Sequence, residues 1–168
     1  MNENFLAFYM GHAFSHAVHV QHHLEPKELM VPFVAYWQEK QSTVIPYPAE
    51  TQAEAVEKAC EAREQSAIGT TGWASCREAL VQQPDGAKLN TLLVEGWNPG
   101  LTPQLEMFVY CRKEPFKLIR GFFWKPHPDA RKNAQVFMGH FKDGILSHPF
   151  GQKSIEYVER AEPIQFVS

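Results

Sequence analysis

Four strand-like segments follow one another between residues 72 and 124, and the last three carry apolar side chains on both alternating faces. Turn signals such as Pro84-Asp85-Gly86 separate the segments, which predicts an antiparallel meander. A sheet with one face in water alternates apolar with polar residues. Because a large bare apolar patch is unusual on a soluble monomer, we expect a helix, a partner subunit or a ligand to cover the second face.

Helices and a strand pair are predicted around this meander. Apolar residues recur at steps of three and four over residues 5–24, which predicts a helix. A strand pair is expected over residues 29–38 and 43–47, and a capping box at Thr51 and Glu54 begins a second helix. A third helix is predicted over residues 129–141, and a final edge strand over residues 164–167.

The fold class that these segments predict is α+β. We expect an antiparallel four-strand meander with an additional N-terminal strand pair, packed by two to three helices, as a single domain over residues 1–168. The order of elements resembles that of the cone-shaped folds of the nuclear-transport-factor-2-like type, in which helices close a curved sheet around a pocket. This resemblance implies a pocket. It lies in element order alone and transfers no site residue.

Residues 11–23 (GHAFSHAVHVQHH) contain an unusual number of histidines. His12, His16, His19 and His23 are spaced by 4, 3 and 4 residues, so a helix places them in one stripe. Imidazoles at i and i+4 can share one metal ion, here zinc, although the HExxH glutamate is missing. The favoured interpretation is a solvated helix flank or an oligomer interface. The alternatives are a metal site and a pH response, because clustered imidazolium ions repel one another.

A second candidate site is an aromatic pocket on the meander, because a pocket combines apolar walls with a few polar groups. The predicted ligand-binding residues are Trp73, Trp97, Tyr110, Trp124, Glu95 and Glu106. The alternative is that the aromatic residues fill the core. If the pocket is catalytic, Glu95 or Glu106 is the acid–base candidate, but the sequence assigns no catalytic residue.

The cysteines and the net charge of the chain argue against some classes of protein. Cys60, Cys76 and Cys111 are odd in number and form no CxxC motif, which indicates reduced thiols and a cytoplasmic location. No motif supports Cys76 or Cys111 as a nucleophile. The net charge of −3 without a basic run argues against nucleic-acid binding. No apolar stretch approaches the ~20 residues that cross a bilayer.

These patterns predict a non-catalytic interaction module that forms a homodimer or binds a protein partner through an apolar sheet face. The alternative is a protein with a cone-like pocket for a small apolar ligand or substrate. Either protein is expected to need no cofactor, except zinc if the histidine stripe is a metal site.

Overall fold

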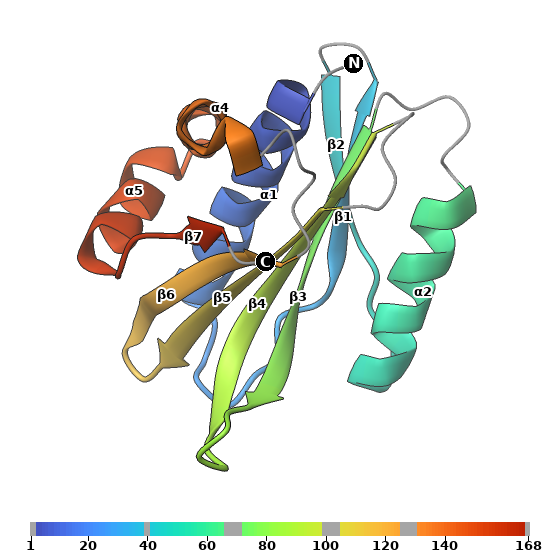
Figure 1. The fold of residues 1–168 in the computed structure, drawn as a ribbon. Helices are drawn as coiled ribbons and strands as arrows, with labels where there is room; N and C mark the ends of the chain where they lie inside the picture. The colour runs from blue at the N-terminus through green and yellow to red at the C-terminus, as the bar shows by residue number, and fades with distance from the viewer. Residues whose placement is uncertain (1–2, 39–40, 66–71, 99–104, 125–130, 167–168) are drawn as a thin grey trace.

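The computed structural model describes residues 3–38, 41–65, 72–98, 105–124 and 131–166, which form one seven-stranded sheet with helices on both faces (Figure 1). The strands are β1 (Phe33–Gln38), β2 (Gln41–Pro46), β3 (Gly72–Gln82), β4 (Lys88–Trp97), β5 (Leu105–Lys113), β6 (Phe116–Trp124) and β7 (Gln165–Phe166). The helices of this part of the chain are α1 (Glu3–His23), α2 (Gln52–Gln65), α4 (Ala134–Ser147) and α5 (Gly151–Arg160).

The predicted α+β fold with an antiparallel meander is confirmed. The strand order is β2-β1-β3-β4-β5-β6-β7, and every neighbouring pair is antiparallel except β6 and β7. Gly86 turns β3 into β4 with a φ of 88°, a left-handed conformation that favours glycine. The predicted cap of α2 is also present, because the Glu54 amide donates to the Thr51 hydroxyl at 3.2 Å.

The C-terminal helices differ from the sequence-based expectation. The helix predicted over residues 129–141 is α4, which runs to Ser147, and residues 125–130 lie outside the described part of the chain. The second helix, α5, was not predicted. It is amphipathic, because Ile155, Tyr157 and Val158 pack against the core, but it has only ten residues, so its apolar pattern spans less than three turns.

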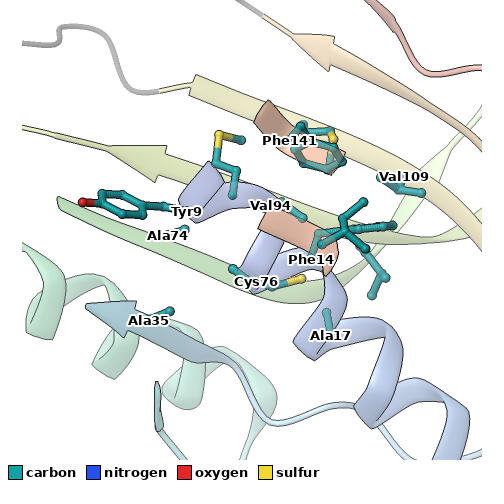
Figure 2. Close-up of a cluster of buried hydrophobic side chains, with 14 of the residues drawn as sticks. Tyr9, Phe14, Ala17, Ala35, Ala74, Cys76, Val94, Val109 and Phe141 are labelled. Atoms are coloured by element: carbon teal, nitrogen blue, oxygen red, sulfur yellow. The ribbon is translucent and has the colours of Figure 1, made fainter. Parts of the chain in front are cut away.

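The two faces of the sheet are covered by different helices. We call the face that packs against α1 and α4 the first face, and the face that α2 packs against the second face (Figure 1). Figure 2 shows the core on the first face, where Phe14 of α1 and Phe141 of α4 lie beside Val109 of β5. Because side chains alternate along a strand, the neighbours of these core residues point to the second face.

Helices α1 and α4 cross in direct backbone contact. A Cβ atom added at Gly11 of α1 would lie 2.0 Å from the carbonyl oxygen of Phe141. A Cβ added at Gly144 of α4 would lie 2.0 Å from the carbonyl oxygen of Phe8. No side chain fits at either position, so the crossing requires glycine on both helices.

A buried ion pair fixes the connection between α1 and β1. Lys113 Nζ lies 2.8 Å from Glu78 Oε1, and the two side chains are 9% and 2% exposed. The backbone amide of Met30 donates to the other oxygen of Glu78, and Lys113 donates to the carbonyl oxygen of Glu28. Each buried charge therefore has a partner, as a low-dielectric interior requires.

We predict that Gly11→Ala destabilises the protein while Gly139→Ala does not. The added methyl group at Gly11 meets backbone atoms, and overpacking of this kind costs about 1–3 kcal/mol of unfolding free energy or more. Gly139 lies on α4 with nothing within 4 Å of an added Cβ, so alanine there gains roughly 0.5–1 kcal/mol from helix propensity. Urea unfolding followed by circular dichroism measures both. Equal stability of the two variants would contradict the backbone contact.

Candidate functional site

Three of the four predicted histidines surround a fifth one, His148, which follows α4. The ring centroids of His12, His16 and His19 lie 5.2, 5.3 and 5.7 Å from that of His148. We call these four residues the histidine cluster. His23 lies at its edge, with its ring 4.9 Å from that of His19. The crossing of α1 and α4 thus brings together imidazoles that the sequence separates.

Hydrogen bonds define the protonation of the cluster. The backbone amide of Phe150 donates to His148 Nδ1 at 3.0 Å, so the proton of the neutral ring is on Nε2. That Nε2–H donates to His16 Nδ1 at 3.1 Å. The hydroxyl of Ser147 donates to the carbonyl oxygen of Gly144, so its oxygen accepts from His12 Nδ1–H at 2.7 Å. Within the cluster, His16 and His148 are thus bonded to each other and His12 to Ser147, while Nδ1 of His19 is buried without a hydrogen-bond partner among the described residues.

Burial keeps these histidines neutral. It lowers the pKa of His12, His16 and His19 below the ordinary value of 6.5. Burial together with repulsion from His16, His12 and His19 lowers the pKa of His148 to about 4. Nearby, Tyr157 of α5 lies with its hydroxyl 2.6 Å from Nδ1 of His22, and burial, followed by repulsion from His23 and Lys153, lowers the pKa of His22. None of the neighbouring charges that shift these pKa values is a carboxylate.

The donor set does not match a preformed zinc site. Metal ions bind the unprotonated nitrogen of a neutral imidazole, but the Nε2 of His148 that faces His16 carries its proton. Among the described residues, no three histidine, cysteine, aspartate or glutamate side chains are arranged to hold one metal ion. A shared ion between His16 and His148 would require His148 to give up its bond from Phe150. The zinc site remains a sequence-based prediction.

The aromatic residues predicted to line a pocket share the second face, and part of them lies beneath α2. Trp73 and Trp97 are cross-strand partners whose rings stack with centroids 6.3 Å apart. Arg63 of α2 lies over Trp73 at 4.6 Å, and its guanidinium reaches Glu95 Oε1 at 3.1 Å. It also donates to the Ser75 hydroxyl at 2.9 Å. Glu95 is therefore a buried carboxylate in an ion pair with Arg63.

The other predicted pocket residues lie further along the sheet. Glu106 is opposite Glu95 in the β4–β5 register, and Trp124 is opposite Glu106 in the β5–β6 register. The side chain of Trp124 lies outside the described part of the structure. Tyr110 packs beneath Arg120, whose guanidinium lies 5.4 Å from the ring centroid. The six predicted positions thus share one face, on which Glu95 and Glu106 adjoin as direct cross-strand partners.

Sequence reasoning missed an aromatic pair on the same face, between Glu106 and Tyr110 in the register of β5. Phe108 of β5 and Phe122 of β6 are cross-strand partners with stacked rings, 5.4 Å between centroids and 12° between planes. Both side chains are half-buried. The signal was present, because these strands are apolar on both faces, but it does not show which apolar residues the helices leave uncovered.

The two buried cysteines lie on the first face, among the core residues. Burial raises the pKa of the Cys111 thiol to about 12 and that of Cys76 well above its ordinary value. Nearby Glu78 raises both further. Because the thiolate is the reactive form, neither side chain is suited to act as a nucleophile at neutral pH.

No protein-family model, curated protein or solved structure matches this chain. The resemblance of the element order to cone-shaped folds therefore stays a prediction. Among the described helices, none combines the length and apolar character needed to cross a membrane.

We predict that the free energy of unfolding decreases as the pH is lowered from about 6.5 to 4, and that His148 contributes to this decrease. In this window the unfolded chain binds protons at histidines whose native pKa is lowered, so the folded state loses free energy as the pH falls. In His148→Asn, the asparagine oxygen can still accept from Phe150, but the titrating group is gone. Its unfolding free energy should depend less steeply on pH than that of the wild type.

The control for this prediction is His140→Asn, on α4 outside the cluster, which should keep the wild-type slope. Urea unfolding at pH 7, 5.5 and 4.5 measures all three proteins. A His148→Asn slope equal to that of the wild type would contradict the prediction.

We also predict that native Cys76 and Cys111 resist thiol reagents. Both are buried and have raised pKa values, whereas Cys60 on α2 is partly exposed. Labelling with an aromatic disulfide reagent at pH 8 should modify Cys60 first, and the other two only after urea is added. Rapid labelling of three thiols in the native protein would show that the sheet opens readily.

Proposed function

We propose that the protein is a non-catalytic interaction module that binds a second copy of itself through the second face of its sheet. The observation that carries this proposal is the stacked, half-buried pair Phe108–Phe122. Among the described helices, α2 is the one on this side, and it packs over Val34 of β1 and Trp73 of β3 (Figure 1). The pair lies on β5 and β6, on the part of the face away from α2.

The chemistry around this pair is that of a protein interface. Tyr110 and Arg120 flank the two phenylalanines, and aromatic residues and arginine are enriched among the residues that dominate binding energy. These side chains are already held in place, because the rings stack and Arg120 lies over Tyr110. Side chains ordered in this way lose less entropy on binding, which favours association.

The charges on this face are complementary to themselves. Glu106 and Tyr110 lie two residues to either side of Phe108 on β5, and Arg120 is the cross-strand partner of Tyr110. A two-fold axis that crosses the strands at Phe108, in the plane of the interface, places Glu106 of each copy opposite Tyr110 of the other, and therefore beside Arg120, the cross-strand partner of Tyr110. Self-complementarity of this kind is what a symmetric dimer requires. Glu106 has no ion-pair partner among the described residues, so its carboxylate is available.

The proposal includes no catalysis, because the candidate acid–base and nucleophilic groups are paired or buried within the fold. Glu95, one acid–base candidate, is paired with Arg63, and the thiols of Cys76 and Cys111 have raised pKa values. The histidine cluster contains no carboxylate to orient or activate an imidazole. These groups stabilise the fold, which supports a binding role for the face rather than a reaction.

We predict that the wild type is dimeric at micromolar concentration and that charge reversal disrupts and restores the dimer. Glu106→Arg and Arg120→Glu should each weaken the dimer at least tenfold, because each places like charges across the interface, and about 1.4 kcal/mol corresponds to tenfold. The double variant restores opposite charges and should recover most of the affinity. Light scattering on a sizing column over a concentration series measures the association. Glu57→Arg, an exposed change on α2, is the matched control.

The apolar contribution has its own pair of variants. Phe108→Ser should yield a monomer, whereas Leu80→Ser should not, although Leu80 is 62% exposed on the same sheet. Leu80 lies on the first face, because it is an alternate residue of β3 with Cys76 and Glu78. A wild type that is monomeric at all concentrations, or a double charge variant no better than the single ones, would overturn the proposal.

A further inference from the structure

A groove of about 590 Å³ lies between β6 and α5, and it begins one cross-strand pair beyond Tyr110 and Arg120 of the proposed interface. Its walls are apolar and include Phe116 and Leu118 of β6 and Tyr157 of α5. The rings of Phe116 and Tyr157 meet edge to face, 5.2 Å between centroids, and so join the strand to the helix. A volume of this size is in the range of sites that bind small molecules.

Three cations from three different elements also line the groove. They are Arg112 of β5, Lys117 of β6 and Arg160 in the last turn of α5, and the one carboxylate among the lining residues is Glu162. Within the described part of the chain, none of the three cations forms an ion pair. The groove is therefore electropositive beside an apolar wall.

Two of these cations are placed against each other. Arg112 and Lys117 are direct cross-strand partners in the β5–β6 register. Like charges directly opposite each other destabilise a sheet, and no carboxylate among the described residues forms an ion pair with either cation to offset the repulsion. An arrangement that costs stability without a compensating contact is typical of a functional site.

The backbone next to the groove is irregular. Tyr110 pairs with Arg120 and Cys111 with Leu118, so Ile119 is an extra residue, a β-bulge in β6. The amide of Glu162 donates to the carbonyl oxygen of Ile119 at 2.9 Å, which ties the segment after α5 to the bulge. Strand β7 pairs only with Phe122 and Phe123, so the groove lies along the part of β6 that β7 does not reach. Bulges commonly re-aim side chains beside binding sites.

We propose that this groove binds a small amphiphilic anion, an apolar chain or ring that carries a carboxylate, phosphate or sulfonate. The head group lies among Arg112, Lys117 and Arg160, where it relieves the repulsion between the first two. The apolar body lies against Phe116, Leu118 and Tyr157. The ligand is a single molecule taken from solution, since the groove has the volume of a small-molecule site rather than of a flat membrane contact.

The test is isothermal titration of the full-length protein with laurate below its micelle concentration. The wild type should bind one laurate per chain, and Lys117→Gln and Arg160→Gln should each weaken binding at least fivefold. Lys142→Gln, an exposed change on α4, is the matched control and should bind as the wild type does. No binding by the wild type, or equal affinity in all four proteins, would overturn the proposal.

A second measurement separates loss of the site from loss of the fold. Because Lys117→Gln removes one of two opposed cations, it should raise the melting temperature of the ligand-free protein while it weakens laurate binding. A variant that lowers both would show that Lys117 is structural, and would overturn its assignment to the site.

Two further titrations distinguish the source of the anion. Inorganic phosphate should bind far more weakly than laurate, and equal affinity would remove the apolar part of the proposal. Sedimentation with phosphatidylglycerol vesicles, without binding of monomeric laurate, would assign the groove to a membrane surface and overturn the inference. The monomeric Glu106→Arg variant should still bind laurate, so this result and the dimer proposal are tested separately.

Discussion

The close backbone approach of α1 and α4 at Gly11 and Gly144 is the constraint on which the other features of the first face depend. With no side chain at the crossing, the two helices lie close enough for Phe14 and Phe141 to pack together on the same strands, 5.7 Å between ring centroids. The same approach sets the end of α4 against the next turns of α1. Ser147 and His148 therefore reach the histidines of α1, and the hydrogen-bonded cluster is a consequence of how two backbones cross.

The polar groups on the two faces of the sheet differ in whether they have partners within the fold. On the first face, buried polar groups form ion pairs and hydrogen bonds with other residues of the fold. Examples are the ion pair of Glu78 with Lys113 and the hydrogen bond from His148 to His16. On the second face, Arg63 forms an ion pair with Glu95 beneath α2, while Glu106, beside a stacked aromatic pair, forms no ion pair with any residue that the structure describes. In the dimer that we propose, this carboxylate and these rings contact the second copy.

The sequence predicted those parts of the fold that depend on residues close to one another in the chain. The meander follows from alternating apolar residues and from turns such as that at Gly86, and α2 begins where the Thr51 cap predicts it. The helix α5 was missed because it is short, with ten residues, so that its apolar pattern rests on few side chains such as Ile155 and Val158. The site was predicted only in part: strand alternation placed Trp73, Glu95 and Tyr110 on one face. It could not show that Arg63 neutralises Glu95, or that His148 meets residues 132 positions earlier, because tertiary packing sets such contacts.

The position of the helix crossing in the chain has a consequence for folding. Helix α1 precedes the meander and α4 follows it, and the bond between His12 and Ser147 joins residues 135 positions apart. During synthesis, the apolar side of α1 thus emerges long before the helix that covers it. Contacts of such long sequence separation slow folding, because a large loop must close before they form. The nascent chain exposes the apolar side of α1 until α4 is made, and transiently exposed apolar surface of this kind favours aggregation.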